Sequence, residues 1–134
     1  MKMGISSSFF GNLNPYEMAE KFIECGIYNT EISEKSHYAF FNNTNEIHEY
    51  KQFIDGLGFS IPQGHLPFMN EGNITSLDNT YAIDNLKKVL DIFYELGIKA
   101  AVIHYSNFGT DVVPVEVWFD VRIDALKKLT DYIK

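Results

Sequence analysis

Three ionisable side chains stand at or near the ends of short apolar stretches: Glu31, His65 and His104. A carboxylate can bind sugar hydroxyls or orient a metal-bound histidine. Neutral imidazole is a common ligand of zinc and other divalent metals. Taken singly, each side chain could equally be a solvated glutamate or a half-buried histidine bonded to a carbonyl. The elements that carry the three residues therefore decide what chemistry they can do together.

The same sequence pattern precedes each of these residues. An amphipathic run ends in a glycine and a strand-like run follows, at residues 25–27, 57–59 and 96–98. Glycine suits the left-handed position that closes a helix. The repetition predicts parallel strands joined by crossover helices, and such sheets place function at the carboxyl ends of their strands. We therefore expect the three ionisable side chains at one edge of a sheet.

Hydrophobic periodicity places four strands and four helices in alternation. Strands are expected over residues 3–8, 28–33, 59–65 and 99–104, the last one buried on both faces. Helices are expected over residues 15–25, 44–57, 78–96 and from Pro114 to the end of the sequence. Residues 34–44, 68–77 and 105–113 are expected to be loops. The first helix has a strong start, with Asn14 as cap, Pro15 next and Glu17 three residues beyond the cap.

The alternation of strands and helices has two common outcomes, an open doubly wound sheet or part of a closed (β/α)8 barrel of about 250 residues. A period of two puts Asn29 and Glu31 on one face of the second strand, and Gln63 and His65 on one face of the third. Polar side chains near strand ends suit the mouth of a barrel. We therefore predict an α/β fold of four consecutive βα units, half of a (β/α)8 barrel, with residues 1–134 as one domain.

Composition narrows the class of protein. The 134 residues are 46% hydrophobic, which is enough for a core, and carry a net charge of −7, which opposes unaided binding to nucleic acid. No run approaches the roughly 20 apolar residues of a membrane span, and residues 1–6 do not resemble a signal peptide. The single cysteine, Cys25, excludes an internal disulfide and is expected to be a buried structural thiol. We predict a cytoplasmic protein.

Other residues are weaker candidates. His37 and His48 are expected at the surface, in a polar loop and an early helical turn. Aromatic residues in the expected loops could wall a pocket for a sugar or another polyol, or pack against neighbouring loops: Phe9, Phe10, Tyr38, Phe40, Phe41 and Phe68. The sequence contains no Walker loop and no GxGxxG, GxSxG or HExxH motif.

Several motifs, in the right order, resemble the xylose isomerase-like barrel superfamily, which includes sugar phosphate isomerases and epimerases and endonuclease IV-type enzymes. They lie at residues 28–32, 64–70, 75–78, 95–98 and 102–104. The resemblance covers the whole sequence as the amino-terminal half of that fold. It implies a divalent metal (Zn²⁺, Mn²⁺ or Mg²⁺) at the carboxyl end of the barrel and proton transfer on a hydroxy-carbonyl substrate.

The resemblance also implies roles for individual residues. In isomerase-type members the first-half histidines contact substrate, so Glu31, His65 and His104 are expected to bind a sugar or polyol. In endonuclease-type members the histidines that match His65 and His104 are metal ligands. The carboxylates and the acid/base pair of isomerase-type members come from later strands, so the general bases are not expected in this sequence.

Three functional hypotheses follow. The first is a sugar isomerase/epimerase-like protein of which this chain supplies the first-half rim of the site. The second is a non-catalytic α/β binding or assembly module. The third is an endonuclease IV-like metal-dependent DNA repair enzyme fragment, which the negative net charge disfavours. Because a four-stranded half-barrel has two unpaired edges, self-association is expected under the first two hypotheses.

Overall fold

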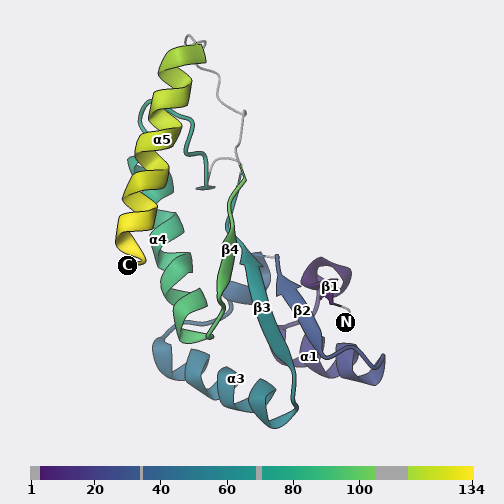
Figure 1. Ribbon diagram of the computed structural model, residues 1–134. Helices are drawn as coiled ribbons and strands as arrows, with labels where there is room; N and C mark the ends of the chain where they lie inside the picture. Colours follow the sequence, from purple (N-terminus) through teal and green to yellow (C-terminus); the bar gives the residue numbers. More distant parts are fainter. Residues whose placement is uncertain (1–3, 34, 69–70, 105–114) are drawn as a thin grey trace. The chain divides into compact units, whose positions relative to one another are not determined.

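A computed structural model describes residues 4–33, 35–68, 71–104 and 115–134. Strands and helices alternate along the chain (Figure 1). The strands are β1 (Ile5–Ser6), β2 (Asn29–Ile32), β3 (Ser60–His65) and β4 (Ala100–Val102). The helices are the 3-10 turn η1 (Ser7–Phe10), α1 (Pro15–Glu24), α2 (Lys35–Tyr38), α3 (Thr44–Gly56), α4 (Thr80–Glu95) and α5 (Val115–Tyr132).

The described chain divides into two compact units. The first comprises residues 1–65 and 91–102 and holds the whole sheet; the second comprises residues 66–90 and 103–134. The four strands lie side by side in the order β1-β2-β3-β4, and every neighbouring pair is parallel. Sequential parallel strands with helical crossovers are the arrangement of a (β/α)8 barrel. The predicted fold class, half of such a barrel, is confirmed.

Local signals place the helix ends as expected. Asn14 accepts hydrogen bonds from the backbone N–H groups of Tyr16 and Glu17 through its side chain, and its own backbone N–H donates to the carboxylate of Glu17, which completes a capping box. The three glycines that close the predicted helices have positive φ angles: Gly26 75°, Gly58 67° and Gly97 75°. A side chain at such a φ is penalised, so these positions end their helices and release the next strand.

The two faces of the sheet differ in chemistry because successive side chains alternate. Helices α1 and α3 and the end of α4 pack on one face, here called the helix face, whose strand residues are Thr30, Ile32, Ile61, Gly64 and Ala101. The opposite face is here called the open face, and its strand residues are small or polar apart from Val102: Ser6, Asn29, Glu31, Gln63, His65, Ala100 and Val102.

Aromatic rings fill the helix face. Phe22 of α1 stacks on Phe59 with the ring centroids 6.2 Å apart. The ring of Phe93 lies so close to Gly64 that a Cβ there would come within 2.4 Å of it. Tyr50 of α3 is fully buried and donates through its hydroxyl to the carbonyl of Pro15, and burial raises its pKa. This face is the core of the first unit.

A bulge in β3 sets the register of the open face. Asn29 of β2 pairs with Ser60 of β3, and Glu31 of β2 pairs with Gln63 of β3. The step between these two pairs is two residues in β2 but three residues in β3. The additional residue falls next to Pro62, which lacks an N–H and is tolerated in a strand at such an irregularity. The bulge brings Gln63 level with Glu31.

The second unit contains the segment after β3, the first turns of α4, and α5. Its buried apolar side chains include Leu66, Ile74, Ala82, Ile83, Leu86, Val89, Ala125 and Leu129. Lys87 of α4 lies over the ring of Tyr132 of α5, with Nζ 5.2 Å from its centroid. Gly72 packs against the chain at Pro67, where a Cβ would lie 1.8 Å from the Pro67 carbonyl oxygen. A glycine is therefore required at position 72.

Several details of the sequence-based prediction were wrong. The first strand is only Ile5–Ser6, because residues 7–10 turn into η1. The predicted loop 34–44 contains helix α2. The last strand is not buried on both faces: Ala100 and Ala101 are exposed, since β4 is an edge of the sheet. Cys25 is exposed, not buried, because it caps the end of α1. The predicted loop 105–113 and the helix start at Pro114 lie outside the described residues.

Candidate functional site

Glu31 is the centre of a hydrogen-bonded group on the open face. Gln63 donates through Nε2 to Oε2 of Glu31 over 2.6 Å. Nε2 of His65 lies 3.2 Å from the same oxygen, within hydrogen-bond distance. The Glu31 and His65 side chains are 26% and 21% exposed, so each keeps some contact with solvent. The structure thus brings two of the three predicted site residues, Glu31 and His65, into direct contact.

The group stabilises the ionised form of the Glu31 carboxylate. Burial by itself raises the pKa of Glu31, but the hydrogen bond from Gln63, the charge and hydrogen bond of His65 and a hydrogen bond from Ser6 outweigh it. The net effect lowers the pKa of Glu31 below its ordinary value. An ionised carboxylate only accepts hydrogen bonds, which suits it to ligand hydroxyls that donate them.

A chain of serine hydroxyls adjoins this group where β1 ends. Ser6 pairs with Glu31 across the strands, and its Oγ lies 2.7 Å from Oγ of Ser33. Ser7 is fully buried, and its Oγ accepts from the backbone N–H of Ser33 over 2.9 Å. Because the Ser7 bond ties the end of β1 to the end of β2, the Ser6 hydroxyl is held beside the carboxylate.

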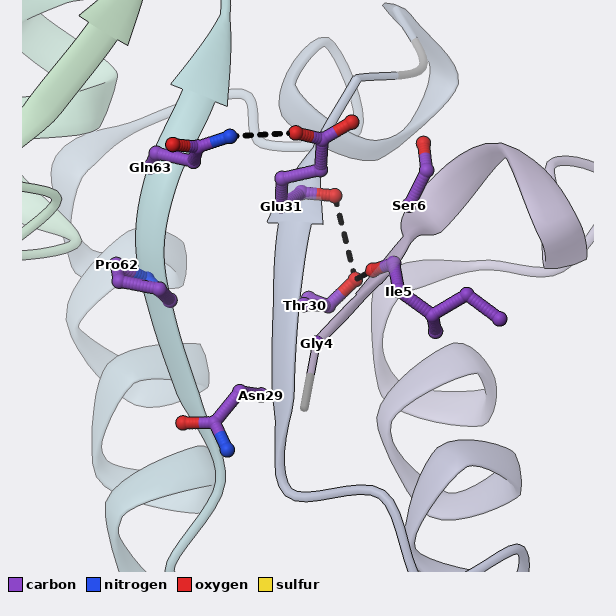
Figure 2. A pocket seen from close by; sticks show the side chains of 8 residues that line it. All are labelled: Gly4, Ile5, Ser6, Asn29, Thr30, Glu31, Pro62 and Gln63. Carbon is purple, nitrogen blue, oxygen red and sulfur yellow. Dashed lines mark hydrogen bonds between the residues drawn. The ribbon is translucent and has the colours of Figure 1, made fainter. Parts of the chain in front are cut away.

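A hollow of about 350 Å³ runs along the open face beneath these groups. In Figure 2 the carboxylate of Glu31 and the hydroxyl of Ser6 lie near each other, and Gln63 reaches toward Glu31 from the next strand. The lining of the hollow comes from the first three strands and the residues next to them: Gly4, Ile5, Ser6, Asn29, Thr30, Glu31, Pro62 and Gln63. Side chains that donate and side chains that accept hydrogen bonds therefore face the same space.

His104, the third predicted site residue, belongs to the second unit. Its ring lies 5.4 Å from that of Phe68, centroid to centroid, and both side chains are exposed. A substrate or metal role for His104 stays a prediction.

The remaining candidates divide into surface and core. His48 is exposed as predicted, with Nε2 2.6 Å from Oε2 of Glu95. His37 was expected at the surface but is fully buried, because α2 turns its ring inward, where Nε2 lies 3.1 Å from the carbonyl oxygen of Leu13. Of the loop aromatics, Tyr38 and Phe41 are buried in packing, whereas Phe9, Phe40 and Phe68 are exposed.

The described residues do not supply a full ligand set for a divalent metal. Glu31 and His65 are two suitable donors, but no group of three His, Cys, Asp or Glu side chains converges within the described ranges. Zinc sites usually take at least three protein ligands. Metal binding by His65 and His104 stays a prediction.

Sequence reasoning missed Ser6, Ser33 and Gln63 as members of the site. Gln63 lay on the predicted polar face of its strand, but the sequence does not tell which residue of the neighbouring strand it meets. Pro62, a proline within an expected strand, was the one available sign that the register changes there. The serines gave no such sign, because Ser is common in turns as well as in sites.

Comparisons with known proteins find solved structures that share the fold of this chain. No protein-family profile and no curated protein sequence matches the chain. Among solved structures, a D-psicose 3-epimerase crystallised with D-fructose superposes with a TM-score of 0.78 at 15% identity, covering 98% of this chain and 48% of that one. The D-psicose 3-epimerase of Clostridium cellulolyticum H10, crystallised with D-tagatose, gives 0.77 at 18% identity, covering 98% and 48%.

A third solved structure, a protein of Sinorhizobium meliloti 1021, gives a TM-score of 0.73 at 12% identity, covering 97% of this chain and 46% of that one. The chain thus spans about half the length of the solved structures it matches. The TM-scores establish the shared fold. At identities this low, the chemistry has to be argued from the residues of this chain. Among the described residues, no helix is both long and apolar enough to cross a membrane.

Proposed function

We propose that this chain forms the first-half rim of the binding site of a sugar isomerase/epimerase-like protein. The observation that carries the proposal is the Glu31–Gln63–His65 group beside the hollow on the open face. It lies where a (β/α)8 barrel binds its substrates, at the carboxyl ends of strands. The likeness in fold to two D-psicose 3-epimerases supports the sugar class.

In this proposal the described residues bind and orient the substrate. Ionised Glu31 accepts hydrogen bonds from two neighbouring hydroxyls, and Gln63 holds the carboxylate in place. The imidazole of His65 and the hydroxyl of Ser6 offer donors to the oxygens of the same substrate. Proton transfer between adjacent carbons requires a base within hydrogen-bond reach of the carbon acid. We assign that base to groups other than these residues, as the family resemblance implies.

Titration of the protein with D-fructose and D-tagatose, followed by NMR of the backbone amides, tests the proposal. We expect saturable shifts at Ser6, Glu31, Gln63 and His65. Gln63→Ala should weaken binding, because it removes the donor that holds the carboxylate. Gln52→Ala, an exposed glutamine of α3, is the matched control and should leave binding unchanged. Shifts that are absent, or the same in Gln63→Ala as in the wild type, contradict the proposal.

Turnover separates an enzyme from a binding module. Exchange of a substrate C–H for solvent deuterium, measured by NMR in D₂O, reports proton transfer at carbon directly. Exchange above the rate without protein supports the isomerase hypothesis. Binding without exchange supports the non-catalytic module. Adding Zn²⁺, Mn²⁺ or Mg²⁺ to the same assay tests the predicted divalent metal.

We also propose that two copies of the chain associate through the sheet edges. Strands β1 and β4 are the two edges of the sheet, and Ala100 and Ala101 of β4 are exposed. An unpaired edge favours pairing with another strand, whereas a lysine on the edge opposes it. Light scattering at micromolar concentration should give a dimer that Ala101→Lys converts to a monomer and Tyr94→Lys, at an exposed helical position, does not. A monomeric wild-type protein contradicts this proposal.

A further inference from the structure

The polar lining of the hollow shows which ligands it can hold. Its open-face side chains Ser6, Asn29 and Gln63 are uncharged, and among the described residues that line it, only Glu31 carries a formal charge. Lysine and arginine are absent from this described lining. Sites for phosphate or carboxylate groups use cations, bidentate Arg or clustered backbone N–H donors. No cationic side chain of that kind is present in the described lining of the hollow.

The contacts of Glu31 also favour the ionised form of its carboxylate. The hydrogen bond from Gln63 is 2.6 Å long, and His65 contacts the same oxygen. Because these contacts favour the ionised form, the carboxylate stays charged at neutral pH and repels an anion. Ligand hydroxyls, by contrast, gain charge-assisted hydrogen bonds to it.

We propose that the hollow selects an uncharged polyhydroxy ligand and rejects its phosphorylated form, with Glu31 as the specificity-determining residue. This inference rests on the proposed sugar-binding function and deepens it, since the isomerase/epimerase class includes enzymes for sugars and for sugar phosphates. The discrimination between the two ligands comes from the charge of Glu31 and from the neutral amide and hydroxyl groups around it. It requires no contact with the second unit.

The size of the effect follows from Coulomb's law. A phosphate carries about two negative charges near neutral pH. Held about 8 Å from Glu31 in water, at a pH at which His65 is uncharged, it would weaken binding about fourfold at an ionic strength of about 10 mM and about twofold at about 100 mM. The preference for the uncharged ligand should therefore shrink as salt is added.

Calorimetric titration with D-fructose and D-fructose 6-phosphate, at low and at moderate ionic strength, tests the inference on the wild-type protein. We expect D-fructose to bind more tightly, with a preference of about fourfold at low salt that falls toward about twofold. The salt dependence needs no variant, so it remains informative even where a substitution disturbs folding.

Glu31→Gln then isolates the charge, because it keeps the shape of the side chain and an oxygen that accepts from Gln63. It should weaken D-fructose binding about threefold, since charge-assisted hydrogen bonds are stronger than neutral ones, and should abolish the preference over the phosphate ester. Glu20→Gln, at an exposed position of α1, makes the same change in net charge away from the hollow and should keep the preference.

The outcomes separate the two proposals. Equal or tighter binding of D-fructose 6-phosphate, or a preference that Glu31→Gln leaves intact, overturns the selectivity and leaves the sugar-binding function standing. Binding of neither ligand overturns the sugar-binding function and this inference with it. A preference that Glu20→Gln removes as fully as Glu31→Gln assigns the effect to net charge and also overturns the role of Glu31.

Discussion

The two faces of the same sheet perform opposite tasks. The helix face is filled by buried aromatic and aliphatic side chains, with the Phe93 ring packed directly on Gly64. The open face carries a hollow lined by Ser6, Glu31 and Gln63, and His65 contacts Glu31 beside it. The interior of a complete barrel is usually filled by layers of Val, Ile and Leu. In this chain the described open face is instead mostly small and polar, and the apolar packing lies on the helix face.

The two faces separate the residues that stabilise the fold from the residues that can bind a ligand. Truncating an apolar side chain on the helix face lowers the free energy of unfolding, because the protein loses the burial of the removed atoms and keeps a cavity in their place. The polar groups of the open face are partly solvated and so exchange protein partners for water at modest cost. Stability should therefore depend on the first face and ligand selectivity on the second.

The largest expected effect is Phe93→Ala on the helix face. Phe93 is 2% exposed, and its truncation should lower the free energy of unfolding by about 3–5 kcal/mol. Tyr94→Ala, at the next residue and 80% exposed, is the matched control and should change it by less than about 0.5 kcal/mol. Urea unfolding followed by circular dichroism measures both. Equal losses would remove the distinction between packed and solvated positions.

The next effect is Gly64→Ala, which adds one methyl group against the Phe93 ring. Overpacking of this kind should cost about 1–3 kcal/mol. Gly56→Ala is the control: a Cβ there meets nothing within 4 Å, and alanine favours the helix, so stability should rise by about 0.5–1 kcal/mol. Opposite signs in thermal unfolding confirm that the close approach at Gly64 is tight. A neutral Gly64→Ala would show that Phe93 moves aside easily.

On the open face, Gln63→Ala should cost only about 1 kcal/mol, the net value of a partly exposed hydrogen bond. The same substitution should raise the pKa of Glu31, because Gln63 donates to its ionised form. NMR titration of the Glu31 side-chain carbon measures this change. An unaltered titration would mean that His65 and Ser6 alone hold the carboxylate.

The smallest effect is a pH dependence that comes from Glu31. Its folded-state pKa lies below the ordinary value of 4.5, so its contribution to stability is fully present above that pH and is lost as the pH falls through the lower folded value. Glu31→Gln should therefore lose less stability than the wild type on acidification below about pH 4.5. Acid unfolding curves of the two proteins provide the measurement, and parallel curves would contradict it.

Local patterns predicted most of the helix ends and the carboxyl-end location of the candidate residues. The capping box at Asn14 and the left-handed glycines Gly26, Gly58 and Gly97 are decided within a few residues, so the sequence carries their full signal. The predicted strand starting at residue 3 failed for a related reason: Ser6 caps the 3-10 turn η1, a local competitor that ended the strand early.

Burial was harder to predict, because it depends on residues distant in sequence. His37 is fully buried, with Nε2 within hydrogen-bond distance of the carbonyl oxygen of Leu13, although the segment that carries His37 is polar. Ala100 and Ala101 form an apolar run, yet they are exposed because no strand follows on that side of the described sheet. Hydrophobic pattern alone does not distinguish an edge strand from a central one.

The alternation of strands and helices, the parallel half-barrel and the location of Glu31 and His65 at strand ends could all be predicted from the residues alone. Those features follow from periodicity and helix-closing glycines, which act over a few residues. The contact of both Gln63 and His65 with one oxygen of Glu31 could not be predicted in this way, since it depends on the bulge beside Pro62. Strand register is a property of two segments at once, and a shift of one residue exchanges the faces.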